Sequence, residues 1–231
     1  MLTTLLLLTA LEGGAKPGSL AALGPVPAGT VRLFLVRHGQ ALSNLDPKPK
    51  LPPAELDHLT ELGRSQSAAA AALLRDQGVR LVLSSPVGRA RETAEILQKE
   101  LGVKETRVEP RIRSLELGRS AAGKALGWDE RQVEWSAGRD PQPPGGESLR
   151  QVADRQLELI ASLARERAGQ AVALVSHGEV IAALAGALQG GPAHKWEELS
   201  LENASVTVVE ASAGKPPRLV LVNVSADEAK P

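Results

Sequence analysis

Two histidines and two arginines in this chain have the types and spacing to do phosphate chemistry. Arg37 and His38 directly follow a short apolar run at residues 31–36. Arg89 lies six residues after a second run, at 79–83, and His177 lies two residues after a third, at 170–175. Unprotonated imidazole can attack phosphorus and form phosphohistidine, and the usual pKa of histidine, ~6.5, leaves the ring largely neutral at physiological pH. Arginine can hold two phosphoryl oxygens at once, which lysine cannot. These residue types therefore indicate phosphoryl transfer through a histidine.

The elements that would position these residues alternate between strands and helices. Strands are predicted where the chain is apolar and rich in strand-forming residues, and helices where apolar residues recur at helical spacing. The predicted strands are residues 31–36, 79–83, 170–175, 205–209 and 218–224, with a short one at 107–112. The predicted helices are one that Thr60 can cap and that runs through residues 65–76, and those at residues 89–101, 148–168 and 180–188.

Continuous apolar strands that alternate with helices are typical of a parallel sheet covered on both faces. We therefore predict an α/β fold with three layers, in which helices lie on both faces of a mostly parallel central sheet. Ligands of such folds bind beyond the carboxyl ends of the strands. The residues that follow the first three long strands should converge there, although they are far apart in the sequence.

Composition excludes several other classes of protein. The 231 residues include no cysteine and four aromatic residues, and 27 Lys and Arg balance 27 Asp and Glu. Disulfide scaffolds and thiolate metal sites are excluded, and nucleic-acid binders usually carry a basic excess. No apolar run approaches the ~20 residues of a membrane span, and no pair of histidines has the spacing of metal ligands. We expect no metal, no cofactor, no nucleic-acid partner and no membrane span.

The first 30 residues differ from the rest. An apolar run is followed by a segment rich in Gly, Pro and Ala, but no Lys or Arg precedes the run as in a typical signal peptide. We predict an N-terminal extension over residues 1–30, a catalytic domain over residues 31–225 and a tail over residues 226–231. A cytoplasmic protein is favoured, and an exported one is the alternative.

Five motifs occur in an order that resembles the histidine phosphatase superfamily, the phosphoglycerate mutase-like clan. They are LVRHGQ at residues 35–40, LTELGRSQ at 59–66, SSPVGRARETA at 84–94, PGGESL at 144–149 and VSHG at 175–178. The resemblance covers residues 31–224. It implies that His38 is the phosphorylated nucleophile and that Arg37, Arg89 and His177 bind the phosphoryl group. It also places Asn44 close to that group, although an asparagine there could instead stabilise its own turn.

The general acid is where the chain departs from the family pattern. The resemblance implies a glutamate four residues before a glycine, and here Ser114 stands four residues before Gly118. Glu116 lies two residues further on and would share the same side of an extended chain. We therefore predict Glu116 as the proton donor, with Glu109 as a remoter candidate.

Residues that the clan's mutases share after the first motif, a Trp-Asn pair and a Phe-Thr-Gly-Trp stretch, are absent here. The resemblance therefore implies the bacterial phosphatase branch. We expect a metal-independent phosphomonoesterase that acts on a small phosphorylated substrate. The alternatives are a phosphohistidine protein phosphatase, whose partner would be a phosphoprotein, a mutase-type phosphotransferase and a non-catalytic phospholigand-binding relative. The sequence leaves the oligomeric state open.

Overall fold

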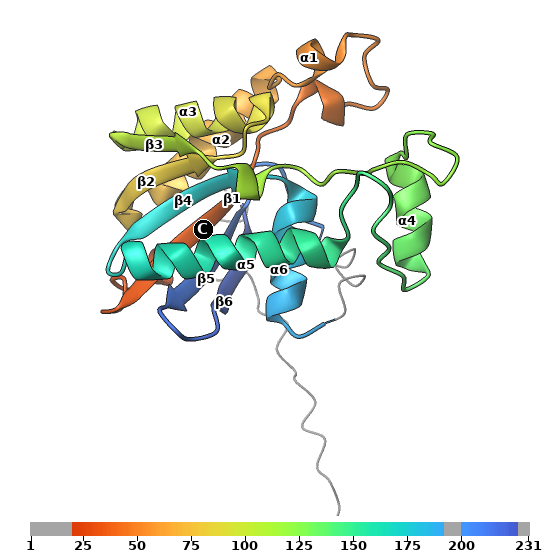
Figure 1. Cartoon of the computed structure of the whole chain (residues 1–231). Coiled ribbons are helices and arrows are strands. Elements are labelled where there is room, and N and C mark those ends of the chain that lie inside the picture. The colour runs from red at the N-terminus through yellow and green to blue at the C-terminus, as the bar shows by residue number, and fades with distance from the viewer. Residues whose placement is uncertain (1–19, 192–199, 226–231) are drawn as a thin grey trace, which may run out of the picture.

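The computed structural model describes residues 20–191 and 200–225, which contain a six-stranded sheet of order β3-β2-β4-β1-β5-β6 (Figure 1). The four strands β1 to β4 run parallel, β5 pairs antiparallel with β1, and β6 pairs antiparallel with β5. Their bounds are β1 Thr30–Arg37, β2 Val79–Ser84, β3 Glu105–Val108, β4 Ala171–Ser176, β5 Val206–Ser212 and β6 Arg218–Val224. The predicted fold class, a mostly parallel sheet between helical layers, is confirmed.

Helices cover both faces of the sheet. Helices α2 (Glu61–Leu74) and α3 (Gly88–Leu101) pack on one face, and α5 (Leu149–Glu166) and α6 (Gly178–Leu188) pack on the other (Figure 1). Strand β1 contributes Phe34 to the first of these cores and Leu33 to the second, because successive side chains of a strand point to opposite faces. Burial on both faces explains why β1, β2 and β4 are largely apolar runs, whereas the edge strand β3 is exposed.

Local signals in the sequence set where two of these helices begin. Thr60 precedes α2 and its hydroxyl accepts a hydrogen bond from Gly63 N at 2.9 Å. Ser148 precedes α5 and forms a capping box with Gln151, whose backbone N donates to the Ser148 hydroxyl at 3.1 Å. Such side-chain caps satisfy N–H groups that have no partner in the first helical turn.

Three segments differ from expectation or were left open by the sequence. The short strand predicted at 107–112 is β3 up to residue 108, and the chain then forms a 3-10 turn over Pro110–Ile112, because proline has no N–H to donate in a sheet. The proline-rich loop contains one helical turn, α1 (Pro53–Leu56), which proline permits at its first position. Between the third and fourth parallel strands lies α4 (Trp128–Ser136), set apart from the sheet in Figure 1.

The described part of the N-terminal extension lies against the sheet domain. Leu20 is buried in the same core as Phe34, and Arg32 donates from Nη1 to the carbonyl of Gly24 at 2.7 Å. Residues 1–19 of the predicted extension and the predicted tail at 226–231 lie outside the described residues. The domain boundaries therefore stay a prediction.

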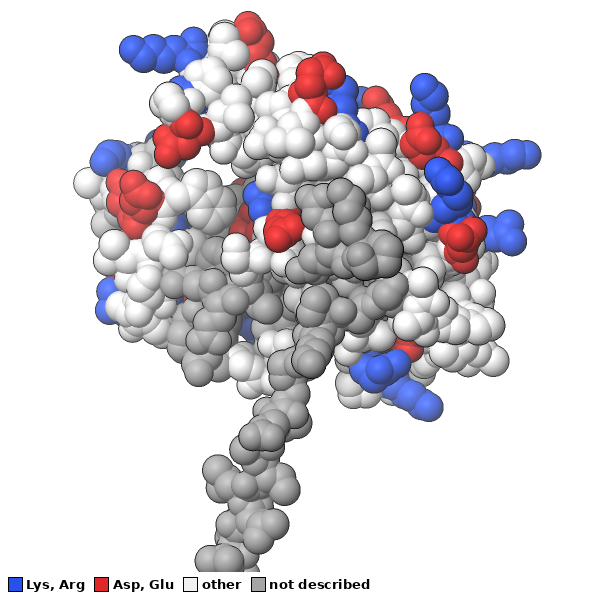
Figure 2. Space-filling view, turned by 180° about the vertical axis from the view of Figure 1, so that it is seen from behind, with Lys and Arg blue, Asp and Glu red and all other residues white. Residues whose placement is uncertain are grey.

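Figure 2 shows that acidic and basic side chains are interspersed on the visible face, so the balanced charge of the sequence is not segregated there. None of the helices among residues 20–191 and 200–225 is long and apolar enough to cross a membrane.

Candidate active site

The carboxyl ends of β1, β2 and β4 bring the predicted histidines together. Arg37 pairs in register with Ser176, and the backbone N of His38 donates to the Ser176 carbonyl at 3.0 Å. His177 directly follows Ser176, the last residue of β4. The imidazole rings of His38 and His177 lie edge to face with centroids 5.2 Å apart. Both histidines are buried, at 3% exposed for His38 and 0% for His177. The sheet edge therefore forms a histidine pair from residues 139 positions apart in the sequence.

The hydrogen bonds of His38 define its tautomer. Nδ1 lies 2.8 Å from the carbonyl oxygen of Gly39, which can only accept, so Nδ1 carries the proton. On the other side of the ring, Nε2 accepts a hydrogen bond from Nε of Arg89 at 2.9 Å. Nε2 therefore carries the lone pair of a potential nucleophile, and it faces a guanidinium group.

Arg89, in the first turn of α3, connects the two histidines. Its Nη2 lies 3.1 Å from Nδ1 of His177, and Nη1 donates to Oδ1 of Asp57 at 2.6 Å. Since arginine only donates, Nδ1 of His177 accepts and the proton of that ring is on Nε2, which donates to the Ser85 hydroxyl at 2.8 Å. An anion bound between the two rings could accept hydrogen bonds from two N–H groups of the Arg89 guanidinium.

Burial and positive charge keep both rings neutral. Desolvation is the largest cause that lowers the pKa of His38 well below its usual value of 6.5, followed by His177 and Arg89. Desolvation also lowers the pKa of His177 well below 6.5, with Arg89 as the next cause. A neutral imidazole is the form that can act as a nucleophile.

Arg37 and Asn44 are placed at the margins of this cluster. Arg37 donates from Nη1 to the Leu201 carbonyl, and its side chain lies against Gly178, where an added Cβ would meet Nε at 3.2 Å. Burial lowers the pKa of Arg37, while the Glu179 carboxylate acts to raise it. Asn44 accepts a hydrogen bond at Oδ1 from the backbone N of Ala41 at 3.0 Å, so its amide stabilises its own turn.

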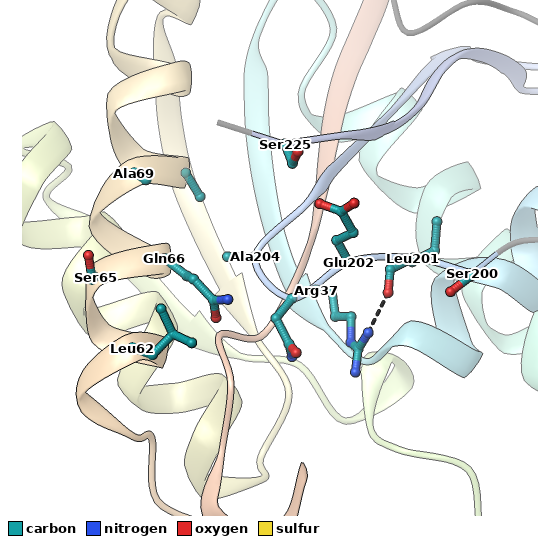
Figure 3. A pocket seen from close by; sticks show the side chains of 12 residues that line it. Arg37, Leu62, Ser65, Gln66, Ala69, Ser200, Leu201, Glu202, Ala204 and Ser225 are labelled. Atoms are coloured by element: carbon teal, nitrogen blue, oxygen red, sulfur yellow. Dashed lines mark hydrogen bonds between the residues drawn. The ribbon is translucent and has the colours of Figure 1, made fainter. Parts of the chain in front are cut away.

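A cavity of about 490 Å³ adjoins Arg37 on the side of α2 (Figure 3). The segment before β5 forms its other wall, and neither His38 nor His177 lines it. The dashed bond in Figure 3 is the contact between Arg37 and the Leu201 carbonyl. The cavity thus contacts the cluster through Arg37 alone.

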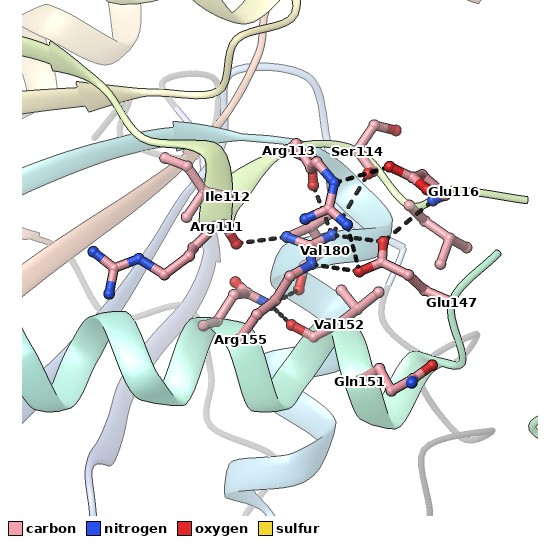
Figure 4. A network of polar contacts seen from close by, with 12 residues as sticks. Arg111, Ile112, Arg113, Ser114, Glu116, Glu147, Gln151, Val152, Arg155 and Val180 are labelled. Carbon is pink, nitrogen blue, oxygen red and sulfur yellow. Dashed lines mark hydrogen bonds and ion pairs between the residues drawn. The ribbon is translucent and has the colours of Figure 1, made fainter. Parts of the chain in front are cut away.

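The structure does not bring Glu116 to the histidines. Its carboxylate accepts a hydrogen bond from Nε of Arg113 at 3.1 Å, and its side chain is 56% exposed (Figure 4). Glu109, the remoter candidate, is paired with Arg111 at 2.8 Å. The proton donor predicted at Glu116 therefore stays a prediction without a contact to the cluster among the described residues.

A partly buried ion-pair network holds the segment that contains Ser114 and Glu116 (Figure 4). The guanidinium of Arg155, on α5, donates to the carbonyls of Arg111 and Arg113 at 2.5 and 2.9 Å. It also donates to the carboxylate of Glu147 at 2.9 Å, to which Arg113 donates at the same distance. Helix α5 thus fixes the backbone around Ser114.

Sequence reasoning missed three residues that contact the cluster or the segment beside it. Asp57 precedes the Leu-Thr start of the second motif and binds Arg89, and Ser85 stands in the Ser-Ser-Pro turn and binds His177. Glu179, two residues after His177, accepts a hydrogen bond from the Ser114 hydroxyl at 2.7 Å. A carboxylate so close in sequence to a predicted site histidine was the signal available for Glu179.

A neutral imidazole beside a guanidinium group, at the carboxyl ends of parallel strands, could both attack and bind a phosphoryl group. Residues 33–225 match the histidine phosphatase superfamily (branch 1), and the chain belongs to this superfamily.

Sequence and structure comparisons find several proteins similar to this chain. The chain is 30% identical over 187 residues to a probable phosphoglycerate mutase, GpmB, of Yersinia pestis, covering 78% of this chain and 85% of that protein. The structure of a mycobacterial glucosyl-3-phosphoglycerate phosphatase is 32% identical, with a TM-score of 0.65 over 85% of this chain and 100% of the other. A phosphoserine phosphatase of Entamoeba histolytica, at 22% identity, matches in fold with a TM-score of 0.67 over 87% of this chain and 100% of that one.

Proposed function

We propose that this protein is a metal-independent phosphomonoesterase that acts through a phosphohistidine on His38. The observation that carries the proposal is the hydrogen bond from Arg89 Nε to His38 Nε2 at 2.9 Å, with the same guanidinium bound to His177 at 3.1 Å. This geometry holds an unprotonated imidazole nitrogen next to a group that binds phosphate.

In the first step, the lone pair of His38 Nε2 attacks phosphorus, and the bond to the leaving oxygen breaks as that oxygen takes a proton. In the second step, water attacks phosphorus, the P–N bond breaks, and its electron pair returns to Nε2. Arg89 would exchange its bonds to the histidines for bonds to phosphoryl oxygens as the substrate enters. Such bonds stabilise the transition state, where the phosphoryl oxygens carry spread charge.

Arg37 and Asn44 are assigned supporting roles in this proposal. Arg37 would bind a second phosphoryl oxygen, and Gly178 leaves room for its side chain. Asn44 would reach the phosphate only by giving up its bond to the Ala41 amide. The two guanidinium groups would supply the positive charge that Mg²⁺ supplies in many phosphoryl-transfer enzymes.

The comparison with a mycobacterial glucosyl-3-phosphoglycerate phosphatase supports a small phosphorylated metabolite as substrate. The leaving group itself is not defined by the residues of the cluster, all of which would face the phosphoryl group. We therefore propose the substrate class as phosphate monoesters of small polar alcohols.

The test is hydrolysis of para-nitrophenyl phosphate and of a panel of sugar and glycerate phosphates in the presence of EDTA. We expect phosphate release by the wild type and none above background by His38→Ala. His58→Ala is the control, because the side chain of His58 is 63% exposed and pairs with Glu92. Activity that survives in His38→Ala, or that EDTA abolishes and Mg²⁺ restores, would contradict the proposal.

Mutase-type transfer is a second candidate, favoured by the 30% identity to a probable phosphoglycerate mutase. It uses the same phosphohistidine but returns the phosphoryl group to a second substrate hydroxyl instead of water. Interconversion of 2- and 3-phosphoglycerate that outpaces phosphate release would identify this candidate.

A further inference from the structure

Glu179 lies in the first turn of α6 (Gly178–Leu188), two residues after His177. Its Oε1 accepts two hydrogen bonds, from the Ser114 hydroxyl at 2.7 Å and from the backbone N of Leu115 at 3.4 Å. Its Oε2 has no hydrogen-bond partner among residues 20–191 and 200–225, and this oxygen is not fully buried. One oxygen of this carboxylate is therefore fixed and the other is open to an incoming group.

The position of Arg37 indicates that this carboxylate lies beside the cluster of His38, His177 and Arg89. The side chain of Arg37 lies against Gly178, the residue between His177 and Glu179. The charge of Glu179 acts on Arg37 and opposes the effect of burial on its pKa. A substrate whose phosphoryl group lies between His38, Arg89 and Arg37 would therefore have its leaving oxygen within the neighbourhood of Glu179.

Three carboxylates of the cluster and of the segment beside it are already engaged, whereas Glu202, on the cavity side of Arg37, is exposed. Asp57 is ion-paired with Arg89 at 2.6 Å, and Glu147 with both Arg113 and Arg155 at 2.9 Å. Glu116 is paired with Arg113 and 56% exposed. Within the described part of the chain, Glu179 alone among these four has no ion pair at salt-bridge distance.

We propose that Glu179 is the proton donor of the phosphatase reaction, and that Ser114 is the residue that positions it. The inference rests on the proposed function. It assigns the acid to α6 rather than to the segment after β3, where the sequence alone predicted Glu116.

The proton balance requires Glu179 to enter the first step protonated on Oε2, so the carboxylate beside Arg37 first takes up a proton from solvent. That proton passes to the leaving oxygen as the P–O bond breaks and His38 Nε2 takes the phosphoryl group. In the second step the Glu179 carboxylate accepts a proton from the attacking water, and the P–N bond breaks. Each turnover therefore returns both Glu179 and His38 to their starting forms.

Ser114 acts through Glu179 by holding Oε1, which leaves Oε2 to carry the proton. The backbone of Ser114 is fixed in turn by Arg155, which donates to the Arg113 carbonyl at 2.9 Å and to the Ser114 carbonyl at 3.5 Å. A general acid contributes most when the leaving group is a poor one. The consequence is a dependence on the leaving group that a structural role would not produce.

The experiment compares hydrolysis of an alkyl phosphate, glycerol phosphate, with that of para-nitrophenyl phosphate, whose leaving group departs without a proton. For Glu179→Gln we expect kcat on glycerol phosphate to fall about 100-fold or more, and kcat on the aryl ester to fall several-fold at most. Retained hydrolysis of the aryl ester also demonstrates that the variant is folded. Glu61→Gln is the matched control, since Glu61 lies in the first turn of α2 and its side chain is 92% exposed.

Ser114 is tested by the same pair of substrates. Ser114→Ala should lower kcat on glycerol phosphate by about tenfold, without a matching loss on the aryl ester, and Ser114→Thr should restore it because it keeps the hydroxyl. Equal losses of Ser114→Ala on both substrates would remove Ser114 from the positioning of the acid.

The outcomes separate this inference from the proposed function. A wild type that hydrolyses both esters through His38, with Glu179→Gln losing neither or losing both equally, overturns the role of Glu179 and leaves the phosphatase intact. A selective loss in Glu116→Gln instead would assign the acid to Glu116. A wild type that hydrolyses neither ester, or an active His38→Ala, overturns both proposals.

Discussion

Arg89 makes three contacts with one guanidinium group, and each uses a different nitrogen. Nε, Nη2 and Nη1 bind His38, His177 and Asp57 respectively. Asp57 also accepts the backbone N of Gly88 at 2.7 Å, so it fixes both the start of α3 and the direction of the arginine fork. Charge alone cannot reproduce this geometry.

The replacement Arg89→Lys should therefore lower kcat/KM for any phosphate ester by at least about tenfold, equivalent to ~1.4 kcal/mol of transition-state stabilisation. The expected cause is loss of the fork at unchanged net charge. Steady-state kinetics measure the effect, and Arg91→Lys on the exposed side of the same helix is the control. Wild-type kinetics in the Arg89→Lys variant would place Arg89 outside the contacts to phosphate.

The buried neutral histidines should also make the fold sensitive to acid. Burial lowers the pKa of both rings well below 6.5 in the folded state, so the unfolded chain takes up protons first as the pH falls. Stability from this source is fully present above pH ~6.5 and is lost below it, by up to ~1.4 kcal/mol per pH unit for each histidine. Urea unfolding at several pH values between 7 and 5 measures this slope. His38→Ala should show a shallower slope than the wild type, and an unchanged slope would contradict the buried neutral ring.

Single residues differ in how far the sequence alone predicts them. His38, Arg89 and His177 were predictable because each follows a strand, and parallel strands bring their ends to one edge. The contacts of Asp57 and Ser114 depend on how loops fold over that edge, which periodicity does not specify. Glu116 was predicted by assuming an extended chain, but the structure directs its carboxylate to Arg113.

At the scale of elements, α5 secures the segment between β3 and α4 by a partly buried ion pair. The side chains of Arg155 and Glu147 are 10% and 12% exposed, and their network also binds the carbonyls of Arg111 and Arg113. Helix α4 joins the same assembly through Arg131, which donates to the Glu147 carbonyl at 2.8 Å. The elements around Ser114 are thus coupled through arginines rather than through the apolar cores of the sheet.

Replacement of Arg155 by methionine should lower the free energy of unfolding by about 2 kcal/mol, because the carbonyls of Arg111 and Arg113 lose their donor and Glu147 keeps only Arg113 as an ion-pair partner. Urea denaturation measures this loss. Arg150→Met is the matched control on the same helix, since Arg150 is 75% exposed and forms a surface pair with Asp154, which contributes little. Similar losses in the two variants would show that the network does not stabilise this segment.

Strand and helix positions followed largely from apolar periodicity, whereas α4 did not. The residues of α4 are mostly polar, and its first tryptophan, Trp128, is 43% exposed while Trp135 is fully buried. Trp135 packs with Leu115 and Leu149 in a small core of its own, away from the sheet. A helix stabilised by so few apolar contacts gives only a weak periodic signal.

At the scale of the whole molecule, one edge of the sheet brings together the residues of the candidate active site. Three parallel strands, buried on both faces, place His38, Ser85 and His177 side by side, and helices α3 and α6 start there with Arg89 and Glu179 in their first turns. In the proposed mechanism, separate elements of the fold would therefore supply the nucleophile, the phosphate-binding groups and a carboxylate. The sequence order of the motifs was sufficient to predict that His38, Arg89 and His177 converge at this edge, whereas the source of the proton donor stays a prediction.

The central claim is a covalent phosphohistidine on His38, and trapping it tests that claim most directly. The protein is mixed briefly with a substrate that it hydrolyses, quenched at high pH where phosphohistidine is preserved, and digested for mass spectrometry. We predict a phosphoryl group on the peptide that contains His38, lost on exposure to acid and absent in His38→Ala. A turnover-competent enzyme with no label on that peptide, or with a label that persists in His38→Ala, would contradict the account.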